Sequence, residues 1–135
     1  MQPPAQTLPD DLPVDVEEVA AVLRDASAVC AFLHGSWVDG RASDRSDVDV
    51  AALFDAPVDG LAVGARLPGR VDLLVLDTAP AELAGRVALH GLLLLDTDPP
   101  RRVEWVATTR KLHLDERFRR DAARADFVAA HRPRG

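Results

Sequence analysis

Apolar and polar positions change their spacing several times along the chain, and each change marks a new element. From Val16 to about Ser27 the apolar residues recur at helical spacing, which predicts a first amphipathic helix. Asp15, with Glu18 three residues later, has the spacing of an N-cap and capping box for this helix. Residues 1–13 contain four prolines and little periodicity, so we expect a flexible tail there.

Short apolar runs without helical spacing follow the first helix. Residues 28–33 and 47–54 predict two strands, joined by a polar connection that contains glycine. Residues 57–68 contain two glycines and two prolines and predict a loop, after which residues 70–76 predict a third strand. Residues 92–95 are a continuous apolar run of the length of a buried strand.

Two later segments have helical spacing. Pro80 suits the first position of a helix that Gly91 ends. From Arg101 onward an apolar stripe with a period near 3.6 predicts a C-terminal helix, and residues 108–109 are a candidate interruption. The order of these elements predicts an α/β (α+β) fold in which helices cover one small mixed sheet. We expect residues 14–135 to form a single domain that includes the C-terminal helix.

Composition narrows the possible function classes. The chain has 135 residues, of which 47% are hydrophobic and 28% charged, as in an ordinary globular domain. Its net charge of −6 argues against direct binding to a nucleic-acid backbone. The sequence contains neither a long apolar run nor a signal-peptide pattern, and its single cysteine, Cys30, excludes an internal disulfide. We therefore expect a cytoplasmic protein without a membrane partner.

The candidate chemistry is concentrated in residues 33–50. Asp47 and Asp49 are two positions apart in a predicted strand, so they project from one face and repel each other unless a cation lies between them. Mg²⁺ prefers one or two carboxylates, completed by water and substrate phosphate. Gly35 and Ser36 end the preceding strand, where backbone N–H groups and a hydroxyl can face a phosphate. The segment combines half of a metal site with a phosphate-facing turn.

A third carboxylate, Asp72, interrupts the apolar strand of residues 70–76, and such a group is rarely buried without a partner or a metal. If this strand lies beside the earlier one, Asp72 joins Asp47 and Asp49. The three carboxylates and the Gly-Ser turn that they face would then have the groups needed for two-metal nucleotidyl transfer. Two other interpretations are an ion pair of Asp72 with Arg70 or another arginine, and a solvated edge strand for the Asp-x-Asp pair.

The spacing from the Gly-Ser turn to the Asp-x-Asp pair, and on to the third aspartate, matches a family signature. The residues that carry it are Gly35, Ser36, Gly40, Asp47, Asp49 and Asp72. From about residue 14 to 118 the chain resembles the minimal nucleotidyltransferase (MNT) group of the polymerase-β-like superfamily. The resemblance implies that fold, and an Mg²⁺-dependent transfer of a nucleotidyl group to a hydroxyl, with AMP from ATP as the expected donor reaction.

The resemblance also implies roles for single residues. Gly35 and Ser36 would bind nucleotide phosphate, Asp47 and Asp49 would hold Mg²⁺, and Asp72 would complete the metal site or deprotonate the acceptor. Many free-standing members are antitoxins encoded beside a HEPN ribonuclease toxin, and some adenylylate a tyrosine of that toxin. The expected partners are therefore an NTP and a HEPN-type toxin.

Two rival functions stay open at this stage. A non-catalytic antitoxin would block its toxin by occlusion, without a metal. A small-molecule nucleotidyltransferase would usually need an added substrate domain. The sequence does not specify the oligomeric state, the preferred nucleotide base or the acceptor atom.

Several residues near the motif and in the last helix have two interpretations. His34 ends a strand or contacts nucleotide, and Trp37 stacks on a base or packs over the turn. Arg41 and Arg45 are solvated or meet a triphosphate. The arginine-rich C-terminal segment is a solvated helix face or a partner interface, and Trp105 anchors that interface or packs in the core.

Overall fold

The computed structural model describes residues 7–131 of the chain. Helices and strands alternate along it, with one short 3₁₀ turn, η1, before the fourth helix. In chain order the elements are α1 (Val16–Asp25), β1 (Cys30–His34), α2 (Ser36–Asp39), β2 (Val48–Leu53), α3 (Gly60–Arg66), β3 (Val71–Val75), η1 (Leu76–Thr78), α4 (Ala81–His90), β4 (Leu92–Asp96) and α5 (Pro99–Ala130).

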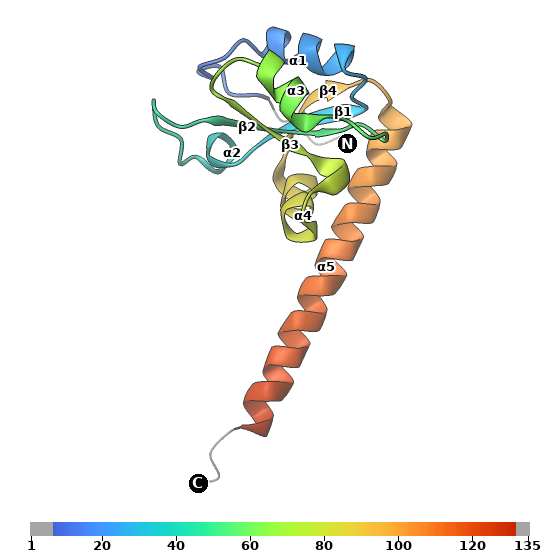
Figure 1. Ribbon diagram of the computed structural model, residues 1–135. Helices are drawn as coiled ribbons and strands as arrows, with labels where there is room; N and C mark the ends of the chain where they lie inside the picture. The colour runs from blue at the N-terminus through green and yellow to red at the C-terminus, as the bar shows by residue number, and fades with distance from the viewer. Residues whose placement is uncertain (1–6, 132–135) are drawn as a thin grey trace, which may run out of the picture.

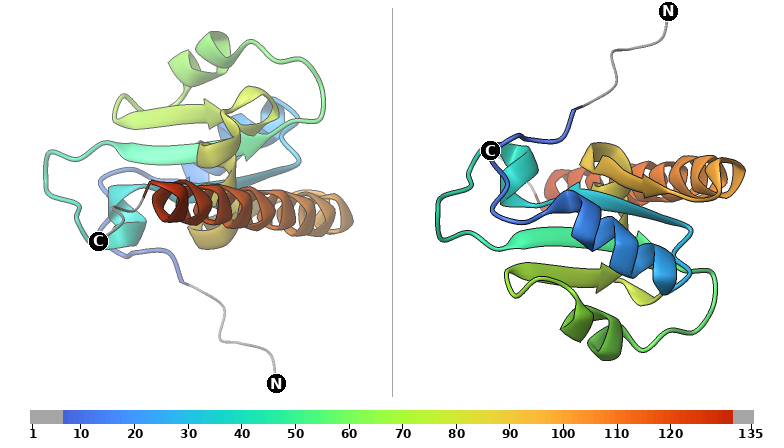
Figure 2. Two further views of the ribbon diagram at one scale, coloured as in Figure 1. Left: turned by 90° about the horizontal axis from the view of Figure 1, so that it is seen from below. Right: turned by 90° about the horizontal axis from the view of Figure 1, so that it is seen from above.

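The four strands form one mixed sheet in the order β3-β2-β1-β4. β1 is antiparallel to both of its neighbours, whereas β2 and β3 run parallel. Helices α1 and α3 lie on one face of the sheet, and α4 with the first half of α5 lies on the other (Figures 1 and 2). The predicted α/β fold, a small mixed sheet covered by helices, is confirmed.

Strand alternation divides the core between these two faces. Leu33 and Val50 pack in the larger cluster beneath α1 and α3, while Phe32 and Ala51 pack in the smaller cluster against α4 and α5. Successive residues of a strand point to opposite faces. Asp49 therefore projects on the side of the sheet that carries α4 and α5.

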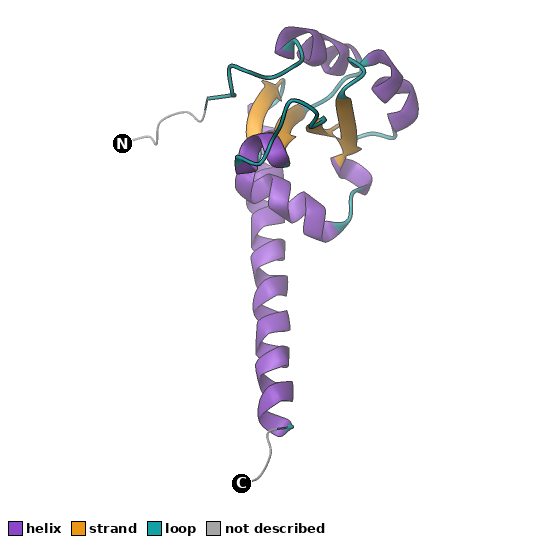
Figure 3. Cartoon of the chain, turned by 90° about the vertical axis from the view of Figure 1, so that its left-hand side faces the viewer, coloured by secondary structure: helices purple, strands orange, loops and turns teal. Residues whose placement is uncertain are grey.

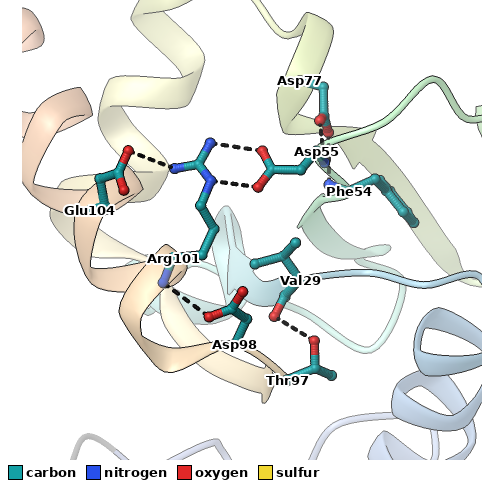
Figure 4. Close-up of polar contacts among 8 residues, drawn as sticks. All are labelled: Val29, Phe54, Asp55, Asp77, Thr97, Asp98, Arg101 and Glu104. Atoms are coloured by element: carbon teal, nitrogen blue, oxygen red, sulfur yellow. Dashed lines mark hydrogen bonds and ion pairs between the residues drawn. The ribbon is translucent and has the colours of Figure 1, made fainter.

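The start of α5 is fixed to the sheet by polar contacts (Figure 4). Asp98 caps the helix by accepting from the Arg101 backbone N–H at 3.2 Å. The Arg101 guanidinium forms a two-pronged ion pair with Asp55, with 2.7 Å between Nη2 and Oδ1. Asp77 in turn accepts from the backbone N–H of Asp55 at 2.7 Å. These contacts join the end of β2, the η1 turn and the first turn of α5.

Residues 57–68 were predicted to be a loop, and this prediction is wrong because residues 60–66 form α3. Asp59 caps the helix by accepting from two backbone N–H groups, and Val63 is buried against the larger cluster. Gly60 and Gly64 lower the intrinsic helix propensity of the segment, so it is packing rather than local preference that forms the helix.

Two further differences concern helix extent. The four-residue helix α2 lies in the connection for which no helix was expected. α5 runs without a break through residues 108–109, where an interruption had been a candidate. Of the predicted N-terminal tail, residues 1–6 lie outside the described part, while Leu8 and Leu12 pack against the larger cluster. None of the helices described is both long and apolar enough to cross a membrane.

Candidate active site

Gly35 forms the turn between β1 and α2. Its φ of 75° and ψ of −149° fall in a region that residues with a side chain rarely adopt. A Cβ built on Gly35 would lie 2.2 Å from Oδ2 of Asp49, which is a severe clash. Only glycine lets the turn approach this carboxylate so closely. The predicted phosphate-facing turn and the predicted metal ligand are therefore in direct contact.

Ser36 is the first residue of α2 and is half-buried beside this contact. Within residues 7–131 its hydroxyl forms no hydrogen bond. The N–H groups at the start of a helix also have no intrahelical acceptor. The turn thus offers a hydroxyl and backbone donors that an oxyanion can accept from.

The three predicted carboxylates come together at one edge of the sheet. Asp47 immediately precedes β2 and is exposed, and Asp49 is the second residue of β2 and is half-buried. The parallel β2–β3 register pairs Asp49 with Asp72, which is exposed. The strand adjacency that the triad required is present.

Electrostatics at this edge reflect the crowding of like charge. Burial raises the pKa of the Asp49 carboxyl above its ordinary value, and the charges of Asp72 and Asp47 raise it further, while His34 opposes them. His34 stands across from Asp49 in the β1–β2 ladder, and burial lowers the pKa of its imidazole. Three carboxylates of like charge crowd this edge, so the site favours a bound cation.

The proposed ion pair between Asp72 and Arg70 is not formed. Nη2 of Arg70 donates instead to the backbone carbonyls of Asp44, at 2.7 Å, and Ser46, at 2.6 Å. Arg70 thereby holds the loop that leads into β2. Within residues 7–131, none of the three predicted metal carboxylates takes part in an ion pair.

The donor set fits Mg²⁺ bound together with a substrate. Within the described residues, no group of three or more His, Cys, Asp or Glu side chains is arranged to hold a metal ion by itself. Mg²⁺ seldom uses such all-protein cages and instead keeps water and phosphate oxygens beside one or two carboxylates. Asp49 with Asp47 or Asp72 supplies that number of hard oxygen ligands.

The other residues near the motif divide between structural and solvated roles. Trp37 packs against the larger cluster, and its Nε1 is buried without a hydrogen-bond partner among the described residues. Arg41 pairs with Asp39 at 2.9 Å on the surface, and Arg45 is exposed. Cys30 is buried in the smaller cluster, and burial raises the pKa of its thiol to about 12, which leaves it unreactive as a nucleophile.

A cleft of 860 Å³ begins at His34 and Gly35 and continues between α4 and the second half of α5. Arg86 and His113, which no sequence motif assigns to a site, both line this cleft. The available signal was helical spacing: Arg117, Arg120 and Arg124 lie three, four and seven positions apart. The residues lining the cleft from α5 are His113, Arg117, Arg120, Asp121 and Arg124.

The chain has similar solved structures but no similar family model or curated sequence. No protein-family model matches the chain, and no curated protein matches it. Solved structures do match. A chain from a toxin–antitoxin structure with AMP-PNP is 22% identical, with a TM-score of 0.68, over 85% of this chain and 99% of that one.

Two further matches come from toxin–antitoxin complexes. An MntA–HepT structure is 22% identical with a TM-score of 0.62, over 84% of this chain and 96% of that one. A complex of a tri-AMPylated HEPN toxin with an MNT antitoxin, from Shewanella oneidensis, is 21% identical with a TM-score of 0.60, over 84% and 95%. The fold is that of the minimal nucleotidyltransferases. The fold that was expected from the Gly-Ser and Asp-x-Asp motifs is thereby confirmed.

Proposed function

We propose that the chain is an Mg²⁺-dependent nucleotidyltransferase that transfers AMP from ATP to a hydroxyl of a partner protein, and that this partner is a HEPN-type toxin. The observation that carries the proposal is the contact of the Gly35 turn with Asp49, which is itself paired with Asp72. This arrangement supports a site in which phosphate donors, metal ligands and a candidate base act together.

The comparisons support both the donor and the partner. One similar structure contains AMP-PNP, and another contains an AMPylated HEPN toxin in complex with an MNT antitoxin. The matches extend over nearly the whole of those chains, so the similarity is not limited to a nucleotide-binding motif.

The residues divide the transfer between them. Gly35 and Ser36 bind and orient the phosphates, while Asp47 and Asp49 hold Mg²⁺, which supplies charge neutralisation for the polyphosphate when it is bound. The acceptor oxygen attacks the α-phosphorus, and the bond from that phosphorus to the bridging oxygen breaks, so pyrophosphate leaves. Asp72 takes the proton of the acceptor hydroxyl, or completes the metal site.

The test compares four aspartate variants by ATP calorimetry and by transfer from α-labelled ATP. The acceptor in the assay is the product of the adjacent reading frame. Asp47→Asn and Asp49→Asn should lose both nucleotide affinity and transfer, as EDTA does. Asp72→Asn should keep affinity and lose about 10²- to 10⁴-fold in rate. Asp44→Asn is the matched control, because it removes an exposed carboxylate of the same loop.

Other outcomes would change the assignment. ATP affinity that is equal with and without metal would remove the metal site. If the Asp49→Asn variant still neutralised the toxin fully, then the chain would act by occlusion of the toxin and not by catalysis. The chain contains no tyrosine, so any tyrosyl-AMP found in the reaction lies on the partner.

A further inference from the structure

The cleft that begins at Gly35 has a positively charged wall in a chain with a net charge of −6. Among the described residues that line it, five are arginines and three are carboxylates. The arginines are Arg41, Arg86, Arg117, Arg120 and Arg124, and the carboxylates are Asp39, Glu82 and Asp121. Such a local reversal of sign attracts anionic ligands.

Much of this positive charge is not neutralised by the residues that the structure describes. Glu82 serves two arginines, with 2.9 Å to Arg120 and 3.8 Å to Arg86. Arg117 and Arg124 form no ion pair or hydrogen bond within residues 7–131. Two guanidinium groups therefore remain available, and guanidinium binds carboxylates and phosphates with paired donors.

Geometry favours a ligand presented from outside the nucleotide site. Arg117 and Arg124 are seven residues apart on α5, which separates them by about 10 Å along the helix. The second half of α5 extends away from the sheet (Figure 3), and Ser36, Asp47, Asp49 and Asp72 do not line the cleft. The arginine wall thus lies along the approach to Gly35 and apart from Ser36 and the three aspartates.

Within residues 7–131, the side chains of this half of α5 are not covered by the rest of the domain. Phe118 is 76% exposed, and no residue of α5 after His113 is buried within the described range. A helix without tertiary packing is only marginally stable in water. The segment has the surface of an element that a partner completes.

We propose that the cleft between α4 and the second half of α5 docks an acidic segment of the acceptor protein and so delivers its hydroxyl to the Gly35–Asp49 site. This inference rests on the proposed function and specifies the chemistry of the partner. Arg117 and Arg124 hold the segment through carboxylate contacts, and Arg120 and Arg86 exchange Glu82 for the partner's acidic groups.

The test is the binding of a fluorescein-labelled hexaglutamate peptide, measured by anisotropy at low salt in EDTA without nucleotide. Arg117→Glu should bind about tenfold more weakly, and adding Arg124→Glu should weaken binding further. Arg119→Glu is the matched control, because this substitution makes the same charge change on the same helix. Arg119 lies about 200° around the helix axis from Arg117. Arg119 does not line the cleft, and its variant should bind within about twofold of wild type.

Two results would overturn the proposal. Equal weakening by Arg117→Glu and Arg119→Glu would show that only the overall field of the helix acts. If inorganic tripolyphosphate binds in EDTA through Arg117 and the peptide does not bind at all, then the wall belongs to the nucleotide. Circular dichroism of each variant verifies that α5 remains helical.

The outcome is separable from that of the proposed function. Asp49→Asn should bind the peptide as tightly as wild type while it transfers no AMP. With a protein acceptor, the Arg117→Glu/Arg124→Glu variant should raise KM for the acceptor and leave KM for ATP unchanged. If the peptide binds through Arg117 but the wild-type protein transfers no AMP, the proposed docking cleft stands and the proposed AMP transfer is wrong.

Discussion

The two halves of α5 belong to one unbroken helix but have opposite surroundings. The first half is capped by Asp98, joined to the sheet through Arg101, and packed by Trp105 against Phe32, with ring centroids 5.8 Å apart. It ends at His113, the one buried residue of the helix in the described structure. After that point, the ion pair between the exposed side chains of Arg120 and Glu82 joins α5 to the rest of the described domain.

The difference teaches that helix continuity and domain membership are separate properties. The first half is ordered by tertiary contacts, which supply most helical stability in proteins. The second half is rich in alanine, arginine and other good helix formers, and so it relies on intrinsic propensity. Side chains such as Leu114, Phe118 and Val128 are 49%, 76% and 56% exposed. The first half therefore contributes to folding, and the second is free to serve recognition.

Gly85→Ala should have the largest effect on stability, because it attacks the point where the packed half ends. A Cβ at Gly85 would lie 2.1 Å from Nδ1 and 2.7 Å from Cβ of His113, so α4 and α5 must separate. We expect a loss of about 2–3 kcal/mol in the free energy of unfolding, measured by urea denaturation.

Gly64→Ala is the control for this substitution. Gly64 lies in α3, and a Cβ there meets no atom within 4 Å. Alanine should stabilise the protein by about 0.5–1 kcal/mol, because glycine is a poor helix former. If Gly85→Ala were as harmless as the control, the buried contact of His113 would not hold α5 to the domain.

The ion pair between Arg101 and Asp55 should have an intermediate effect. Both side chains are about one-third exposed, at 31% and 35%, so solvent screens part of the interaction. A double-mutant cycle with Arg101→Gln and Asp55→Asn should give a coupling energy of about 1 kcal/mol. Asparagine is chosen because Asp55 has a φ of 61°, which asparagine tolerates.

The same cycle on Arg119 and Glu116 provides the comparison from the second half. This pair is 3.9 Å apart and largely exposed, so its coupling should be near zero. A coupling as large as that of Arg101 and Asp55 would contradict the division of α5 into a fixed and a free half.

Removal of residues 116–135 should have the smallest effect on stability. Within the described structure, this segment contacts the domain through exposed side chains. We therefore expect the free energy of unfolding, measured by thermal denaturation, to change by less than about 1 kcal/mol. Hydrogen exchange of the intact protein should show little protection after His113. A loss as large as that of Gly85→Ala would mean that the second half is part of the folding unit.

Much of the candidate site could be predicted because its signals are local in sequence. The Gly-Ser turn and the Asp-x-Asp pair are close together, and strand alternation is enough to place Asp47 and Asp49 on one face. The position of Asp72 was conditional on strand order, which local pattern does not determine. The β2–β3 register then supplied it.

The features that the sequence did not reveal depend on contacts between distant segments. α3 was missed because two glycines weaken its propensity, while burial of Val63 stabilises it. Arg70 was considered a partner of Asp72, but its hydrogen bonds go to backbone carbonyls, which residue types do not specify. The cleft was missed for the same reason, because α4 and α5 are brought together by contacts between distant segments, such as the packing of His113 on Gly85.

The placement of the tryptophans has a consequence for optical spectroscopy. The chain has two tryptophans and no tyrosine, so its intrinsic emission arises from Trp37 beside the Gly-Ser turn and Trp105 at the base of α5. Trp37→Phe would leave an indole that senses only the attachment of the helix. Trp105→Phe would leave one that senses only the turn. In a purified complex, every tyrosine signal in the near-ultraviolet spectrum would come from the partner, so modification of a partner tyrosine can be followed against a constant contribution from the two tryptophans.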